Sequence, residues 1–351
     1  MSRPSSRRSA VGSLVVIAAV VGGGAAAFAY TAGWLSPERL TPARLVDTLA
    51  PPGGPALGHR RNHAKGICFT GTFEANGAGA ALSKAQVLAS GRYPVVGRFN
   101  FAGPDPTAAD ASARVRGLSY RIRTPDGQEW RAAMIDPPFF PVASPQAFYE
   151  LQQASAKKDD PDAMKDFAAA HPEIAAFGAW AKSAPFLQSY AEERFNSLDS
   201  FVFTDASGAD HVVRWSLLPA APPTALSADE MQAKGPNFLE EEIGARVAAG
   251  AQRWTLAITV ADAGDPTADP SQAWPDERRT VDAGTLVVDR IVPEPDGPCR
   301  DINFDPTVLP AGMRTSDDPF PAARSAAYSV SFNRRAAEAD HYPREPEEAS
   351  K

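Results

Sequence analysis

The sequence predicts an α+β fold in which antiparallel strands are joined and followed by helices, with one apolar helix before them. Three observations support this prediction: strand-like segments bounded by turn residues, two segments with helical spacing, and a long uncharged run near the N-terminus. The 351 residues are 44% hydrophobic and 22% charged, which is enough for one large core or two ordinary domains. The 33 prolines are spread along the chain, so we expect many loops and few long helices.

The N-terminal run predicts export of the rest of the chain. Residues 9–37 contain no charged side chain, and Arg3, Arg7 and Arg8 precede them. A run of about 20 apolar residues can span a bilayer, and preceding arginines favour a cytoplasmic N-terminus. A buried helix of a soluble protein is less consistent with the glycines at 22–24.

We expect residues 1–35 to be a transmembrane anchor or a signal peptide. We favour an uncleaved anchor in the cell membrane, single-pass, with the body of the chain on the periplasmic or extracellular side. The alternative is a secreted or periplasmic protein, because Ala27-Phe28-Ala29 fits the small-x-small cleavage pattern.

The remaining chain divides into a linker, a body and a tail. Residues 36–56 predict a short amphipathic helix and a Pro/Gly linker. Residues 336–351 are polar and charged, and we expect a disordered tail there. The body, residues 57–335, shows strand patterns at 98–123, 201–219, 253–260 and 284–292, with a hairpin turn at Ser207-Gly208. Helical spacing occurs at 161–194, interrupted by Pro172 and Pro185, and at 235–250, which ends in glycine.

Composition and motifs exclude several classes of function. The net charge is −7 although three arginines lie in the first eight residues, so there is no electrostatic reason to expect nucleic acid. The five histidines lack metal-binding spacing, and no GxSxG, Walker or GxGxxG motif supports a hydrolase, an NTPase or a Rossmann fold. Two cysteines cannot form a disulfide framework. We expect Cys68 to pack in the core and Cys299, in a proline-rich loop, to be exposed.

A histidine in an arginine-rich stretch, His63, begins a series of short motifs. Taken alone, His63 is more typical of a core or turn histidine than of a catalytic one. The series comprises residues 60–66 (RRNHAKG), 71–74 (GTFE), 93–100 (YPVVGRFN), 116–119 (RGLS), 138–140 (PFF), 145–148 (PQAF), 274–275 (WP), 302–306 (INFDP), 309–312 (LPAG) and 324–328 (RSAAY), with Arg335 further on. An isolated R-x-x-x-Y occurs by chance, but this ordered series is specific. It resembles the haem catalase superfamily, and the chain is most similar to the small catalase-related peroxidases.

The resemblance implies an antiparallel β-barrel core of the catalase type with flanking helices, and haem b as cofactor. It assigns Tyr328 as the axial ligand of the iron. A phenol titrates at about pH 10, and Arg324, one helical turn earlier, can stabilise its phenolate. On the other face, His63 would take a proton from peroxide and return it to the departing oxygen. Asn100 replaces the serine that hydrogen-bonds this histidine in catalases.

The resemblance also assigns residues that hold the haem. Arg60, Arg98 and Arg335 match the family's propionate-binding arginines. Phe140 and Phe148 match aromatic residues that flank the haem plane, although either is also compatible with ordinary core packing.

Two further departures bear on the reaction. Catalases have an asparagine on the distal side of the haem where this chain has Ile135, with Met134 and Asp136 beside it and no amide nearby in the sequence. Asn62 stands where catalases have valine. Loss of a distal polar group should weaken oxidation of a second peroxide more than reduction of the first.

We therefore expect an exported haem peroxidase that reduces hydrogen peroxide or organic peroxides with a small organic reductant and has little catalase activity. One alternative is a catalase-fold haem protein that binds haem or rearranges lipid hydroperoxides, and another is a β-rich binding module without haem. The sequence predicts no nucleic-acid partner, a membrane contact through the N-terminal helix, and no particular oligomeric state.

Overall fold

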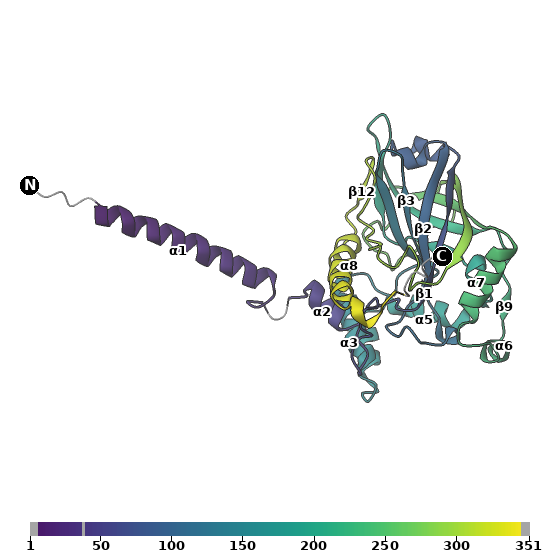
Figure 1. Ribbon diagram of the computed structural model, residues 1–351, viewed down its shortest axis with the longest axis horizontal. Coiled ribbons are helices and arrows are strands. Elements are labelled where there is room, and N and C mark those ends of the chain that lie inside the picture. Colours follow the sequence, from purple (N-terminus) through teal and green to yellow (C-terminus); the bar gives the residue numbers. More distant parts are fainter. Residues whose placement is uncertain (1–5, 37–38, 345–351) are drawn as a thin grey trace, which may run out of the picture.

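The computed structural model describes residues 6–36 and 39–344. Within these residues, eight antiparallel strands close into a barrel, as the resemblance implied (Figure 1). Around the barrel the order is β1 (Gly66–Ala75), β2 (Gly91–Phe101), β3 (Arg116–Arg123), β4 (Glu129–Ile135), β6 (Phe195–Asn196), β8 (Asp210–Pro219), β10 (Gln252–Val260) and β11 (Thr280–Val292), which returns to β1. Strands β7 (Phe201–Thr204) and β12 (Met313–Thr315) extend the sheet beside β8, and β5 (Phe186–Leu187) pairs with β9 (Ala225–Leu226).

Helices flank the barrel on two sides. Helices α2 (Pro42–Asp47), α3 (Pro145–Ala156) and α8 (Phe320–Ala337) lie together on one side, and α6 (Ala228–Gln232) and α7 (Phe238–Ala249) lie on the other (Figure 1). Helices α4 (Ala163–Ala170) and α5 (Ile174–Ser183) follow α3 in the chain. Short 3-10 turns occupy Ala78–Ala81, Gln86–Leu88, Asp110–Ser112, Tyr190–Glu192 and Ala339–His341. The α+β prediction is confirmed.

Large aromatic side chains fill the barrel. Trp130, Trp215 and Trp254 are each at most 2% exposed, and the rings of Trp130 and Trp215 lie 5.1 Å apart. Phe99 on β2 packs against Trp254 on β10 at 5.7 Å, so strands on different parts of the wall share one core. Burial on this scale makes the barrel a firm support for side chains at its strand ends.

Most predicted elements are present. The predicted hairpin joins β7 to β8 with Gly208 at φ 90°, and the helix predicted at 235–250 is α7. The helical segment 161–194 splits into α4 and α5 around Pro172, and the chain becomes extended after Pro185. Helix α3 was not expected, although Ser144 caps it by accepting a hydrogen bond from the Ala147 N–H and Pro145 opens it.

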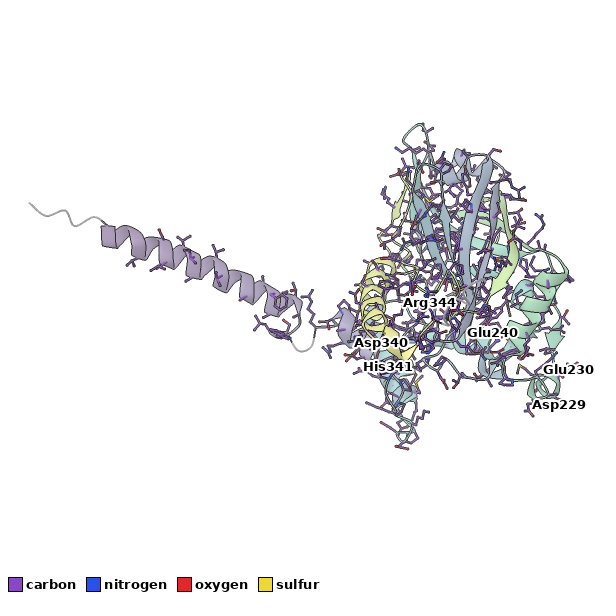
Figure 2. All side chains as sticks on the ribbon, viewed as in Figure 1. Asp229, Glu230, Glu240, Asp340, His341 and Arg344 are labelled. Carbon is purple, nitrogen blue, oxygen red and sulfur yellow. A yellow bond between two sulfur atoms is a disulfide. The ribbon has the colours of Figure 1, made fainter. Side chains whose placement is uncertain are left out.

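The expected linker and tail are more structured than the sequence indicated. Helix α2, in the linker, packs against α8, where Asp47 pairs with Arg334 at 2.6 Å. In the tail, Glu338 accepts from the Gly58 N–H at 3.0 Å and Tyr342 stacks on His59 at 4.0 Å (Figure 2 labels the neighbouring Asp340 and His341 beside α8). The expectation of disorder is therefore corrected for residues 336–344, because polar side chains there pair with the 58–61 segment; residues 345–351 lie outside the described residues.

The expectation for the cysteines was wrong in part. Cys68 is buried as expected, but Cys299 is buried too and forms a disulfide with Cys68. The bond joins β1 to the loop that follows β11, two segments that barrel closure brings together.

Helix α1 (Ser6–Thr31) stands clear of the barrel (Figure 2). Its segment Val11–Thr31 is long and apolar enough to cross a membrane, and none of it is buried against the protein. Such a helix fits either a membrane span or a signal sequence.

Candidate active site

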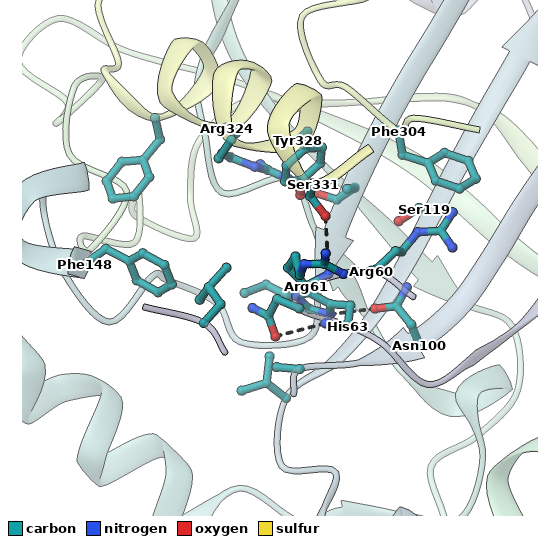
Figure 3. Close-up of a pocket in the computed structure, with 18 of the residues that line it drawn as sticks. Arg60, Arg61, His63, Asn100, Ser119, Phe148, Phe304, Arg324, Tyr328 and Ser331 are labelled. Carbon is teal, nitrogen blue, oxygen red and sulfur yellow. Dashed lines mark hydrogen bonds between the residues drawn. The ribbon is translucent and has the colours of Figure 1, made fainter. Parts of the chain in front are cut away.

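A cavity of about 480 Å³ lies between the barrel and helix α8 (Figure 3). Every residue assigned a role from the sequence lines it: His63, Asn100, Arg60, Arg98, Phe140, Phe148, Arg324, Tyr328 and Arg335. Tyr328 and Arg324 project from α8, and His63 and Asn100 lie across the cavity (Figure 3). The structure therefore brings together residues that span more than two thirds of the sequence.

His63 precedes β1 in a constrained backbone conformation. Its φ is 53°, in the left-handed region that residues other than glycine rarely adopt. Arg98 holds this conformation by donating to the carbonyl oxygens of His63 at 2.8 Å and of Ala64 at 3.0 Å. A Cβ at Gly66 would lie 2.6 Å from Arg98 Cζ, so a glycine is needed for the guanidinium to come this close. The arginine assigned to haem binding thus also supports the histidine.

Asn100 fixes the protonation site of His63. Its Oδ1 lies 2.7 Å from His63 Nδ1, and its Nδ2 faces the Arg98 carbonyl at 3.4 Å. An amide oxygen only accepts, so Nδ1 carries the hydrogen and Nε2 keeps its lone pair. A Cβ at Gly117 on β3 would lie 2.5 Å from Asn100 Oδ1, which explains the glycine of the RGLS motif.

Burial keeps His63 neutral. Burial, and next the positive charge of Arg98, lower the pKa of His63 to about 4, against the opposing hydrogen bond with Asn100. A neutral imidazole with a free Nε2 is ready to accept a proton at neutral pH.

Tyr328 is joined to a buried carboxylate through Arg324. Arg324 Nη2 donates to the Tyr328 hydroxyl oxygen at 3.1 Å and to the Ala133 carbonyl at 2.7 Å, and its Nη1 pairs with Asp199. Burial alone would lower the pKa of Arg324, but the negative charges of a Tyr328 phenolate and of Asp199 raise it. Arg324 therefore stays protonated and keeps its hydrogen bond to the Tyr328 oxygen charge-assisted.

The sequence reasoning did not find Asp199. It lies in the loop between β6 and β7, near Asp318, which accepts from the N–H of Phe320, the first residue of α8, at 2.9 Å. Burial, and next the charge of Asp199, raise the pKa of Asp318 to about 7. No local motif marks Asp199, since it meets Arg324 only after the chain has folded.

Two of the three assigned arginines, Arg60 and Arg98, share one buried carboxylate, Glu294, which the sequence did not reveal. Arg98 binds it with two donors, Nε to Oε1 at 2.8 Å and Nη2 to Oε2 at 2.6 Å, and Arg60 Nη1 pairs with Oε1. Arg60 and Arg335 also donate to the carbonyl oxygens of Arg300 and Ile302. Burial opposes ionisation of Glu294, but Arg98 and Arg60 outweigh it and lower its pKa.

Phe140 and Phe148 form part of the apolar lining. Their ring centroids lie 5.5 Å apart, and Phe140 also packs edge-on against Phe320 of α8 at 4.9 Å. Phe148 faces into the cavity from α3 (Figure 3). These mutually tilted rings provide an apolar part of the cavity wall.

One wall of the cavity lacks a free amide at the position where catalases carry one. Ile135 and Met134 line the cavity there. The structure places an amide opposite Ile135, that of Asn196 on β6, which the sequence did not reveal. Its Nδ2 donates to the carbonyl oxygens of Asp136 and Pro137, both at 3.0 Å. Its Oδ1 accepts from Arg194 and Ser216.

Known proteins match this chain over most of its length. The family model for catalase matches residues 29–342. The chain is 33% identical over 301 residues to a catalase-related peroxidase of Synechococcus elongatus, covering 84% of this chain and 89% of that protein. It is 30% identical over 298 residues to a catalase-related peroxidase of Mycolicibacterium paratuberculosis, covering 84% of this chain and 95% of that protein. The chain belongs to the catalase family.

Catalase-family membership confirms the resemblance drawn from the motif series. It identifies the protein as an oxidoreductase that acts on peroxide, of the catalase-related peroxidase kind, and it implies a haem cofactor. The residues present fit that cofactor, because one apolar cavity carries a phenol paired with arginine and a separate cluster of buried arginines.

Proposed function

We propose that this protein is an exported haem peroxidase that reduces hydrogen peroxide or organic hydroperoxides with a small organic electron donor and dismutates peroxide only weakly. The observation that carries the proposal is the pairing of two opposed groups in one cavity. His63 presents a neutral base with a free Nε2, and Tyr328 presents a phenol activated by Arg324 (Figure 3).

The chemistry of each side chain indicates which part of haem b it would bind. Tyr328 would bind the iron as phenolate, since the guanidinium of Arg324 donates to its oxygen and Asp199 holds that guanidinium in place. Arg60, Arg98 and Arg335 would face the two propionates, since a buried carboxylate needs a cationic partner. Phe140 and Phe148 would flank the ring. Bound haem supplies the redox chemistry that the side chains lack.

His63 acts as the general acid and base of the reaction. Reduction of a peroxide O–O bond consumes two electrons and two protons, which the organic donor and solvent provide. His63 Nε2 takes the proton of the attacking peroxide and returns it to the oxygen that leaves as water or alcohol. Asn100 keeps Nδ1–H in place throughout, so the same nitrogen accepts and donates.

The distal wall supports reduction over dismutation. Oxidation of a second peroxide needs additional polar groups to orient it, whereas Ile135 and Met134 are apolar and the Asn196 amide is committed to backbone carbonyls. An organic donor can instead deliver its electrons without a tightly held second peroxide.

Export rests on two independent features. Helix α1 has the length and composition of a span or a signal sequence. The Cys68–Cys299 disulfide is typical of proteins in oxidising compartments outside the cytoplasm.

The assignment of Tyr328 as the residue that would hold the iron is tested by Tyr328→Phe in the full-length protein. The variant should lose haem, measured as the ratio of haem absorbance to protein absorbance after purification, because the phenyl ring offers the iron no ligand. Phe148→Leu is the matched control, since it alters the same cavity without touching a ligand, and it should keep at least half of the haem. Full haem occupancy in Tyr328→Phe would show that Tyr328 does not hold the iron.

A further inference from the structure

One amide beside His63 has hydrogen-bond donors that the protein does not use. Asn62 Oδ1 accepts from the backbone N–H of His63 at 2.9 Å and from that of Gly103 at 2.8 Å. Two donors on one oxygen fix the amide plane, so Nδ2 points away from this backbone. Among residues 6–36 and 39–344, Nδ2 donates to no protein group, and Asn62 lines the cavity.

The other amides on this wall are differently placed. Asn100 uses its oxygen on His63 and turns its Nδ2 toward the Arg98 carbonyl. The Nδ2 of Asn196 is bound to two carbonyls. Neighbouring lining residues such as Val115 and Ile135 have no donor. The Asn62 Nδ2 group is thus a hydrogen-bond donor without a protein acceptor, next to the proton-accepting His63. Apolar residues surround it, and an unsatisfied donor in such surroundings costs free energy.

We propose that Asn62 is a catalytic residue that binds the substrate: its Nδ2 group donates a hydrogen bond to the peroxide while His63 accepts the proton. The inference rests on the proposed peroxidase function and adds the group that holds the substrate. Asn62 exchanges no proton and forms no covalent bond. It stabilises the oxygen on which negative charge grows as the O–O bond breaks, which is the most effective place for a fixed donor. The ligand class is any hydroperoxide, because the contact is to the O–O unit.

Two substitutions separate this role from support of the backbone. Asn62→Asp keeps an oxygen for the His63 and Gly103 N–H groups and removes the NH2 donor, whereas Asn62→Val removes both. The measurements use the haem-loaded full-length proteins. One is the second-order rate constant of the spectral change on mixing with hydrogen peroxide, and the other is the dissociation constant of cyanide, which accepts a hydrogen bond without turnover.

We expect both variants to react with peroxide about 100-fold more slowly and to bind cyanide about tenfold more weakly. The matched control is Ala102→Asp, which adds a carboxylate at an exposed position bordering the same cavity and leaves the amide intact. It should change either quantity by less than about threefold, because an exposed charge is screened.

The inference is overturned if Asn62→Asp retains the wild-type rate and cyanide affinity, because Asn62 would then only support the backbone. It is also overturned if Ala102→Asp loses as much as Asn62→Asp, because the added charge would then explain the loss. If Asn62→Val does not fold, the comparison of Asn62→Asp with Ala102→Asp still decides. A wild-type protein that binds no haem would contradict the proposed function itself, and this is seen in the wild-type spectrum before any variant is compared.

Discussion

At the residue scale, the backbone and the side chain of His63 depend on the same neighbours. The left-handed backbone is held by Asn62 and Arg98, and the ring is oriented by Asn100. Substitution of any of these three residues is therefore expected to act through His63 as well as directly. Because three residues hold His63, its geometry stays the same while it accepts a proton and returns it.

The pH dependence of the reaction reports on His63. Because its pKa is lowered to about 4, the neutral form is present above that pH and is lost as the pH falls through it. The rate constant of the haem-loaded protein with hydrogen peroxide should thus be constant from about pH 8 to about pH 5 and decline below that, measured by stopped-flow absorbance. A decline centred at about pH 6.5, the ordinary value for histidine, would show that the ring is not enclosed as described.

The sequence identified residues that line one cavity, but not the carboxylates that hold their side chains in place. His63, Tyr328 and Arg324 were found because short motifs of fixed order surround them. Asp199 and Glu294 were missed because their partners are 125 and 196 residues away in the chain. Such pairs are created by barrel closure, and nothing in the local sequence of either carboxylate indicates them.

At the element scale, the loop between β11 and β12 controls the charge of the arginine cluster. Arg60, Arg98 and Arg335 carry three positive charges and Glu294 carries one negative charge, which leaves two, the number that two propionates neutralise. The same loop contains Cys299, whose carbonyl accepts from Arg60 at 3.1 Å. The disulfide to β1 therefore fixes a loop that orients Arg60, one of the side chains proposed to face the cofactor.

Glu294→Gln should destabilise the haem-free protein by about 3 kcal/mol, because it leaves buried arginines without their carboxylate. The haem-loaded variant should lose less stability than the haem-free variant, since the propionates would replace part of the missing negative charge. Unfolding in urea of the haem-free and haem-loaded proteins measures both.

Glu74→Gln is the matched control, because Glu74 also pairs with two arginines, Arg92 at 2.8 Å and Arg253 at 3.2 Å, but at the surface. It should cost less than about 1 kcal/mol. The lowered pKa of Glu294 means that its contribution is present above about pH 4.3 and is lost as the pH falls further, so Glu294→Gln should lack this part of the acid destabilisation. Equal stability of Glu294→Gln and wild type at pH 7 would contradict the charge-balancing role.

Elements with a repeating pattern were predicted better than elements defined by their ends. Strand patterns at 253–260 and 284–292 predicted β10 and most of β11, and a terminal glycine predicted the end of α7. Helix α3 was missed because its start signals, Ser144 and Pro145, are short and easily taken for a loop. The segment after α8 has a composition typical of disorder, yet it is ordered through pairing of Glu338 with Arg61.

At the scale of the whole molecule, helix α1 and the barrel are joined by a segment that packs on the site. Helix α2 follows α1 and lines the cavity through Leu45 and Val46, while Arg44 donates to the Tyr149 hydroxyl at 3.0 Å. Removal of α1 should therefore leave the site intact provided that α2 is kept.

A chain that begins at Ser36 should be recovered in the soluble fraction with full haem content, whereas the full-length chain should sediment with membranes. Protease added to intact cells should not reach the body, but it should cleave the body once the outer barriers are opened. This result would place the body outside the cytoplasm. A full-length preparation found soluble and lacking its first 29 residues would instead show that α1 is a cleaved signal peptide.

The most direct test of the central claim follows two products in one sample. Purified haem-loaded protein is mixed with hydrogen peroxide and a phenolic dye, and dye oxidation and oxygen release are recorded together. Reduction by an organic donor predicts about two oxidised dye equivalents per peroxide consumed and little oxygen. Release of about one oxygen molecule per two peroxides, with the dye unchanged, would contradict the peroxidase assignment and identify a true catalase.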